Sequence, residues 1–364
     1  MGAAGATLQG SWSGATGQVY ESGFLFGADQ SNLAELDDLK CDGSNNASGS
    51  FSVSVGGLAS STTYYYKAYI RELNESTNNY DYRYGDVRSF TTSSSGQLTS
   101  NGYLSCYEIP AMAWSGTGSS GSETYGSTKW YSYETTTSTQ KAVTHTYSYN
   151  GKIYRNYTTY MDKTKLAPLW CAFVMHNGAY PRNSVGRLGD WHNDPAFPAD
   201  WQQESAPGSY SRGHFVASNY RQANADANKQ TFYCTNQALQ WQNSFNSGVW
   251  SSLEDDVIAH SPTGRDTLYV VVGTMYKTST TAGGVPVPSH FYTLLMKCSF
   301  NTNGDMTAAS GCAYLFTNEA HSGASYSSFV TSIDAVETET GINYFANVPD
   351  LYENAAEASK SPLW

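Results

Sequence analysis

Arg212, Gly213 and His214 stand together in the stretch YSRGHFVAS, residues 210–218, and could act on one phosphate group. A histidine with its ordinary pKa of about 6.5 can take a proton from water near neutral pH. The planar guanidinium of Arg212 suits a phosphate oxygen, and Gly213 allows a close approach of the backbone. The apolar residues FVAS predict a strand that has His214 near its start. The alternative is a turn whose histidine makes only structural hydrogen bonds.

A second set of polar residues follows in TFYCTNQALQWQNSFNSGVWSSLEDDVIAH, residues 231–260. TFYCT predicts a strand, and apolar residues recur every four positions after Asn246, which predicts a helix from there onward. Asn246 and Glu254 are eight residues apart, about 80° around a helix, so they would share one side. Asn246 could cap the helix or bind a metal through its amide oxygen. Glu254 could be a solvated acid or could hold water on that metal.

These residue types together would suit the hydrolysis of a phosphodiester. The reaction needs a base that activates water, which His214 could supply. It needs a divalent cation against the charge that develops on the phosphate and on the leaving oxygen. A second positive group, such as Arg212, would hold the remaining phosphate oxygens. Mg²⁺ prefers oxygen ligands and keeps most of its waters, so one amide from Asn246 could be enough.

The order of RGH on a first strand, a second strand, and N-x(3)-W-x(3)-E on a helix resembles the DNA/RNA non-specific endonucleases, a ββα-metal nuclease family that includes the endonuclease G-like enzymes. Further segments resemble the family in the same order and extend the likeness to about 220 residues: RNYTTYMDKTKLAPLWCAFVM, DWHNDPAFP, LYVVVGTMY, VPVPSHFYTLLMK and SIDAVETETGINYFANVPD.

The resemblance implies a divalent-metal-dependent endonuclease that cleaves both DNA and RNA, with Mg²⁺ as cofactor and Mn²⁺ as a possible substitute. It implies that His214 is the general base, Asn246 the metal ligand, and Arg212 a contact to the phosphate. Glu254 would orient waters on the metal, and Asn236 would lie near the active site and help to place the base or a water.

Two positions depart from the family pattern. The family usually has an aspartate where Ser211 stands, and serine carries no charge to orient the site. The family often has an arginine one turn after the helix glutamate, where this chain has Ile258. Phosphate binding could therefore be weaker, or it could use other basic residues. The candidates, each of which could equally be a solvated surface charge, are Lys163, Lys165, Arg182, Arg187, Arg221 and Lys229.

Other polar residues carry weaker signals. His192 and His290 are expected to be structural. Asp190, His192 and Asp194 could form a metal cluster, but their spacing fits a proline-bounded loop equally well. The six cysteines contain no CxxC pair, so a zinc site is not predicted. Cys298 and Cys312 flank the probable turn NTNGD and could form a disulfide across a hairpin or remain buried thiols.

Residues 1–95 and 96–364 are expected to form separate domains, with SSSGQ as a flexible linker. The first part alternates short apolar runs with turn residues, which predicts an all-β sandwich. Leu58, Thr62 and Tyr64, with Ala68, resemble the tyrosine-corner pattern of fibronectin type III domains. The expected fold is thus multi-domain: a fibronectin/Ig-like sandwich followed by an α+β ββα-metal nuclease domain with a central antiparallel sheet.

Charge and composition limit the functions that remain. The net charge of −11 argues against nucleic-acid binding over the whole surface, because phosphate binding needs local cations. The acids are concentrated at the end, where residues 319–364 hold seven acidic residues and one lysine. No stretch is long and apolar enough to predict a membrane span, and no signal peptide is visible. The composition, rich in Ser, Thr and Tyr, suggests an exported protein.

Two functions from different classes therefore stay open. One is the metal-dependent endonuclease. The other is a catalytically weakened nuclease fold that acts as a binding module at the cell surface, for which Ser211, the missing arginine and the negative charge are the reasons. A glycan or surface partner for residues 1–95 is compatible with either.

Overall fold

The computed structural model describes residues 5–44, 47–56, 62–74, 77, 79–91, 106–111, 118–133, 137–182, 185–302 and 304–364, and only the backbone at 5, 7, 36–44, 54 and 56. The chain forms two compact units. The first contains Met1–Cys106 with Asn303–Asp305 and Asn347–Pro349, and the second contains the remainder. Among the described residues, no helix is long and apolar enough to cross a membrane.

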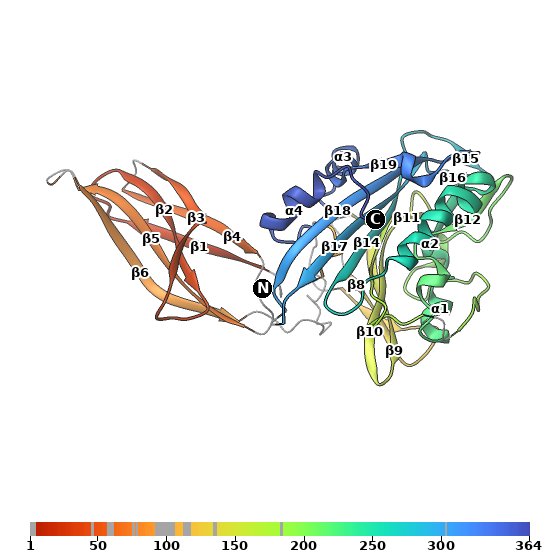
Figure 1. Ribbon diagram of the computed structural model, residues 1–364, viewed down its shortest axis with the longest axis horizontal. Coiled ribbons are helices and arrows are strands. Elements are labelled where there is room, and N and C mark those ends of the chain that lie inside the picture. Colours follow the sequence, from red (N-terminus) through yellow and green to blue (C-terminus); the bar gives the residue numbers. More distant parts are fainter. Residues whose placement is uncertain are drawn as a thin grey trace. The chain divides into compact units, whose positions relative to one another are not determined.

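The first unit consists of two antiparallel sheets (Figure 1). One pairs β1 (Gly5–Ser13) with β4 (Ser48–Gly56), and the other has the order β3-β2-β5-β6. The strands of the second sheet are β2 (Val19–Gly27), β3 (Ala34–Ser44), β5 (Thr63–Asn74) and β6 (Asn79–Thr91). Leu8 and Val53 from one sheet and Phe24 from the other share one buried core. Tyr64 stacks on Phe26 in this unit, whereas Leu58 of the tyrosine-corner pattern lies outside the described residues.

The second unit is organised around a nine-stranded antiparallel sheet with the order β19-β18-β17-β14-β11-β10-β9-β8-β7. The expected central antiparallel sheet is therefore confirmed. LWCAFVM, DTLYVVVGTMY and HFYTLLMKCSF, which the sequence predicts as strands, lie in its middle as β11, β14 and β17. The strands are β7 (Ser120–Ser122), β8 (Lys129–Tyr133), β9 (Gln140–Tyr149), β10 (Lys152–Asp162), β11 (Ala167–Met175), β14 (Thr267–Met275), β17 (His290–Phe300), β18 (Met306–Thr317) and β19 (Val330–Thr331).

A separate two-stranded ribbon and a helix lie on one face of this sheet. β12 (Tyr210–His214) pairs with β13 (Gln237–Trp241), an irregular segment follows, and α2 (Ser251–Ala259) comes next. The helix buries Leu253 and Val257 in the same core as Val270 and Leu295 of the sheet. Burying side chains of this size stabilises the fold by roughly 1.5–3 kcal/mol each, which fixes the ribbon and helix on the sheet. The shorter elements of this unit are α1 (Ala225–Gln230), β15 (Thr281–Ala282), β16 (Val285–Pro286), and single turns of 3-10 helix at Ala199–Trp201, Ser218–Tyr220, Cys234–Asn236 and Tyr326–Phe329.

The other face of the sheet carries α3 (Ile333–Thr340) and α4 (Asp350–Glu357), drawn in dark blue beside β18 in Figure 1. Neighbouring residues of β18 lie on opposite faces of the sheet, because successive side chains of a strand point in opposite directions. Cys312 and Phe316 belong to the core that contains α2. Gly311 instead faces Ile333 and the carbonyl oxygen of Ala356, where an added Cβ would come within 2.8 Å of that oxygen.

The structure corrects three local predictions. TFYCT is not a strand: its residues form a turn and the start of a 3-10 turn at Cys234–Asn236, and the strand begins at Gln237. FVAS is not a strand either, so His214 ends β12 rather than beginning a strand. The helix begins at Ser251 instead of Asn246, because Ser244 has φ +58° and Gly248 leaves the helical region. Apolar spacing alone does not detect these backbone breaks.

Free thiols are found at four of the cysteines whose side chains are described: Cys171, Cys234, Cys298 and Cys312. β17 and β18 do form the expected hairpin, but its register places Cys298 opposite Ala309 and Cys312 opposite Leu295. The disulfide between Cys298 and Cys312 is therefore excluded, and both are buried thiols.

Candidate active site

A cleft of about 700 Å³ opens where the β12–β13 ribbon meets the segment leading into α2. Its lining includes His214, Arg212, Asn246 and Glu254, which the sequence proposes as a site, and also Arg187. The structure thus brings four of the five proposed site residues to one cavity. The fifth, Asn236, is fully buried and does not line it.

His214 is held at the end of β12 by aromatic packing. Its ring centroid lies 4.5 Å from that of Trp191, and Phe232 meets it edge-on at 5.2 Å. Within the described part of the chain, its buried Nε2 atom has no hydrogen-bond partner. Burial, followed by the positive charges of Arg187 and Arg212, lowers the pKa of His214 to about 3. The imidazole is therefore neutral at physiological pH and has a nitrogen free to accept a proton.

Gly213 allows the ribbon to close beside His214. It pairs with Ala238 across the ribbon, next to the side chain of Gln240. A Cβ atom at position 213 would stand 2.3 Å from Oε1 and 2.5 Å from Cβ of Gln240, which is closer than such atoms approach in proteins. The glycine is thus required by the close packing of two strands and not by an unusual backbone angle.

Arg212 and Arg187 flank His214 with two guanidinium groups. The Nη1 atom of Arg212 donates to the carbonyl of Glu204 at 3.1 Å, and its Cζ atom lies 5.2 Å from the Trp191 ring centroid. The Nη1 atom of Arg187 donates to Ser218 Oγ at 3.1 Å. Neither arginine forms an ion pair with a described carboxylate. Their charge is consequently available to an anion in the cleft.

Asn246 and Glu254 supply oxygen atoms on the other side of the cleft. The Nδ2 atom of Asn246 donates to Gln242 Oε1 at 3.0 Å, which leaves the amide oxygen as the free end of the side chain. Trp250 Nε1 donates to Glu254 Oε1 at 3.0 Å and fixes that carboxyl group. Burial is the main cause that raises the pKa of Glu254 to about 8. A neutral amide oxygen and a carboxyl group, which a bound cation would keep ionised, are oxygen ligands that fit a hard divalent cation.

Comparison with known proteins identifies the family of this chain. The model of the DNA/RNA non-specific endonucleases matches residues 119–351. This chain belongs to the DNA/RNA non-specific endonuclease family. A nuclease of Serratia marcescens is 26% identical over 180 residues, which cover 45% of this chain and 64% of that protein. A solved chain of the EndoG/EndoGI complex has a TM-score of 0.46 and 21% identity, over 56% of this chain and 86% of that chain. This chain thus spans less than two thirds of the length of the Serratia relative.

Asn236 connects the ribbon to the preceding turn. Its Oδ1 atom accepts from the backbone nitrogen of Val216 at 2.9 Å, and its Nδ2 atom donates to the carbonyls of Val216 and Thr231. The carbonyl of Asn236 also accepts from Phe215 N. These bonds fix the backbone directly after His214, so Asn236 can position the base without facing the cleft.

Of the six additional bases that the sequence suggests, only Arg187 lines the cleft. Lys163 pairs with Asp200 at the surface. Arg221 is buried, and it donates to the carbonyls of Asn156 and Val174. The remaining three make other contacts: Lys165 lies over Tyr276, Lys229 lies over Tyr125, and Arg182 donates to Asn177 and to the carbonyl of Ile258.

The proposed metal cluster at residues 190–194 does not form. Asp194 turns inward, and its carboxylate contacts His145 and Thr235. The Nδ1 atom of His192 lies 2.7 Å from the carbonyl oxygen of Asp190, not from a carboxylate. His290 contacts Ser289 Oγ. Asp194, His192 and His290 therefore contact other protein groups and do not face one common metal position.

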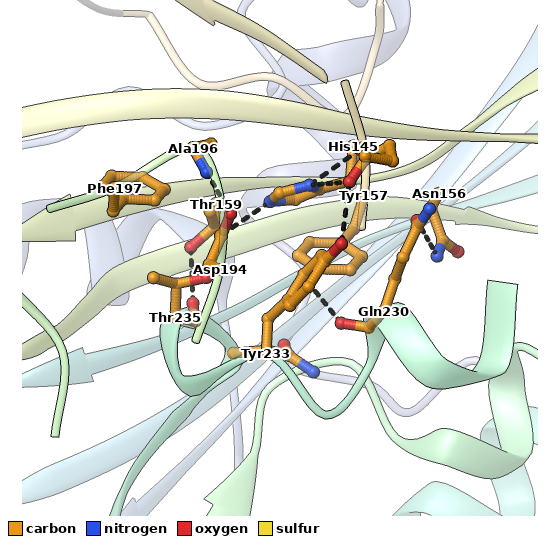
Figure 2. A network of polar contacts seen from close by, with 12 residues as sticks. His145, Asn156, Tyr157, Thr159, Asp194, Ala196, Phe197, Gln230, Tyr233 and Thr235 are labelled. Atoms are coloured by element: carbon orange, nitrogen blue, oxygen red, sulfur yellow. Dashed lines mark hydrogen bonds and ion pairs between the residues drawn. The ribbon is translucent and has the colours of Figure 1, made fainter. Parts of the chain in front are cut away.

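Sequence reasoning missed a buried ion network behind the ribbon, centred on His145 of β9 (Figure 2). The Nδ1 atom of His145 lies 3.0 Å from Glu123 Oε1, and its Nε2 atom lies 3.0 Å from Asp194 Oδ2. Tyr233 donates to Glu123, and Thr235 donates to Asp194. The network therefore ties the sheet to the turn that leads into β13. The signal in the sequence was a histidine between two threonines in AVTHTY, a stretch of β9 that the structure buries.

Proposed function

We propose that this chain is a Mg²⁺-dependent endonuclease that hydrolyses phosphodiester bonds of DNA and RNA, with Mn²⁺ as a possible substitute. His214 is the general base, Asn246 the metal ligand, Arg212 a phosphate contact, and Glu254 the group that orients water. The observation that carries the proposal is the unpartnered Nε2 atom of His214 in a cleft that also holds Asn246.

The role proposed for each residue follows from the side of the cleft on which it lies. His214 Nε2 takes a proton from the attacking water, since the imidazole is neutral and that nitrogen has no other partner among the described residues. Arg212 and Arg187 hold phosphate oxygens through guanidinium groups that have no carboxylate partner there. The divalent cation, when bound, stabilises the charge on the phosphate and on the leaving oxygen. Asn236 positions the backbone that carries the base.

The two departures from the family pattern are compatible with activity. The Ser211 Oγ atom donates to the carbonyl of Gln240 at 3.2 Å, so the serine supports the ribbon without adding charge. Ile258 cannot replace an arginine, but Arg187 enters the same cleft from a different segment of the chain. We infer that Arg187 supplies the positive charge that the helix lacks.

A plasmid-nicking assay tests the proposal, with the wild type and His214→Ala each assayed with Mg²⁺ and with EDTA. Nicking should require Mg²⁺ and should fall by about 10²–10⁴-fold in the variant, the usual contribution of a general base. His260→Ala is the matched control, because His260 is exposed at the end of α2 and does not line the cleft. Equal nicking by His214→Ala and the wild type would refute the assignment of the base.

The second candidate is a nuclease fold that has lost turnover and acts as a binding module at the cell surface. Ser211 and Ile258 favour it, because both remove charge that the family uses. It predicts no nicking by the wild type with either Mg²⁺ or Mn²⁺. Retention of labelled DNA by the same sample, without cleavage, would support this candidate over the enzyme.

For the whole chain we propose two domains, 1–95 and 96–364, with a fibronectin type III-like sandwich before the nuclease and export from the cell. The two facing sheets of the first unit support a sandwich, and its exposed Tyr80, Tyr82 and Tyr84 offer aromatic contacts to a surface partner or glycan. A glycan array probed with residues 1–95 tests this role. Uniformly negative binding by a folded fragment would rule out glycans.

A further inference from the structure

Helices α3 and α4 bring a group of acidic side chains together on the sheet face opposite the cleft. Carboxylate oxygens of Asp334, Glu337 and Glu357 all lie within 4.8 Å of one another. Glu353 is one helical turn before Glu357, so it projects from the same side of α4. We call these four residues the acidic cluster. Both helices pack against β18, which fixes their spacing.

Two members of the acidic cluster are buried, and each has one oxygen atom without a partner among the described residues. The exposed fractions are 7% for Glu353 and 6% for Glu357, and the Oε1 atom of each is buried with no hydrogen-bond partner in the described part of the chain. No described lysine, arginine or histidine forms an ion pair with a member of the cluster. Buried carboxylates without a donor or a cation are costly, so this arrangement calls for a positive ligand or a proton.

The carboxylates of the acidic cluster repel one another when they are ionised, because they lie close together. This repulsion would reverse to attraction around a divalent cation.

We propose that the acidic cluster binds one Ca²⁺ ion through its carboxylate oxygens. Oxygens on opposite sides of Ca²⁺ are about 4.6–5.2 Å apart, given Ca–O distances of 2.3–2.6 Å, so a group within 4.8 Å can surround a single ion. The smaller Mg²⁺ would draw the oxygens closer and holds its waters more firmly. The bound ion joins α3 to α4 and thereby fastens the C-terminal helix to the sheet. This site is separate from the cleft and does not depend on the proposed nuclease activity.

Thermal unfolding of the full chain with Ca²⁺ or with EGTA tests the site. Asn246→Ala serves as the background, because it removes the proposed ligand of the cleft and leaves the acidic cluster intact. At a Ca²⁺ concentration of about 100 Kd, the Tm should rise by roughly 5–10 °C. Glu357→Gln should abolish the rise. Asp334→Asn should reduce it, and because Asp334 is exposed this variant is expected to fold.

Glu339→Gln is the matched control, since Glu339 is an exposed acid of α3 that pairs with Lys277 outside the cluster. It should keep the full Ca²⁺ response. A Tm that is insensitive to Ca²⁺, or a rise that persists in both Glu357→Gln and Asp334→Asn, would overturn the proposal. So would a Tm that rises as the pH is lowered from 9 to 6 but does not respond to Ca²⁺, because the two buried glutamates would then share a proton instead of an ion.

Discussion

Replacing His145 with glutamine should destabilise the second unit strongly, because His145 is a buried cation between two buried carboxylates. Its side chain and that of Glu123 are 0% exposed, and so is that of Asp194. Removing the cation leaves two buried negative groups without the ion-pair partner that they share, and among the described residues only the charge of Lys141 still acts on Asp194. Breaking a buried pair in this way costs about 3–5 kcal/mol of the free energy of unfolding. Glutamine fills a similar volume and can donate to only one of the two acids.

Lys163→Gln provides the comparison with an exposed ion pair. The Lys163–Asp200 pair has side chains that are 42% and 62% exposed, and solvent screening limits such a pair to about 1 kcal/mol or less. Urea unfolding at pH 7, followed by tryptophan fluorescence, measures both variants. Trp12 is the only one of the nine tryptophans in Met1–Cys106, so the signal reports mainly on the second unit. A loss below about 1 kcal/mol for His145→Gln would refute the reasoning.

The same residue predicts a dependence of stability on pH. Burial alone would lower the pKa of His145, but Asp194 and Glu123 outweigh it and raise the pKa to about 10. Between pH 6.5 and 10 the native state therefore holds one proton more than the unfolded state. This stabilisation is complete below pH 6.5 and is lost as the pH rises toward 10. At 1.36 kcal/mol per unit, the wild type should lose about 2–3 kcal/mol more than His145→Gln between pH 7 and 9, because the buried Glu353 and Glu357 have raised pKa values and titrate in both proteins. An equal loss in the two proteins would contradict the prediction.

Three further predictions concern the cleft. Arg187→Gln should raise the pKa of His214, because it removes a positive charge that lowers this pKa. NMR titration of the imidazole measures the shift, and an unchanged pKa would contradict the prediction. Gly213→Ala should destabilise the protein by about 1–3 kcal/mol in urea unfolding, because its Cβ would collide with Gln240, and unchanged stability would show that Gln240 moves aside freely. Ser211→Asp should also raise the His214 pKa, by adding a negative charge to the cleft, and a lowered pKa in the same titration would contradict this.

The sequence predicted the sheet and the order of the site elements because long apolar strands and the RGH and N-x(3)-W-x(3)-E patterns are local signals. The apolar run LYVVVGTM strongly favours a strand, and it lies in β14. The start of the helix could not be read in this way. Val249 and Leu253 both follow the break at Gly248, so their periodicity carries no information about the backbone at Asn246, and the helix start was predicted too early.

The role of Asn236 and the choice of Arg187 depended on tertiary packing. Asn236 is near His214 in space but points away from the cleft, because three backbone groups of the adjoining turns take up its amide. The sequence offered no reason to prefer Arg187 over the five other basic residues. Only the path of the chain between β11 and β12 brings Arg187 to the cleft, and no local pattern encodes that path.

The buried His145 and the half-buried His214 show how environment distinguishes a structural histidine from the proposed general base. His145 lies between two acids, which raise its pKa to about 10, and its charge is matched and enclosed. His214 lies near two arginines, which add to burial in lowering its pKa to about 3, and its Nε2 atom has no described partner. His214 is a neutral base beside two arginines that form no ion pair with a described carboxylate, so an anion would balance the charge of this site. A phosphodiester in the cleft would offset the arginine charges and so raise the pKa of His214 toward neutrality, which would strengthen the base once substrate is bound. Under the proposed function, the excess of positive charge around His214 is the condition expected of a site that binds an anionic substrate.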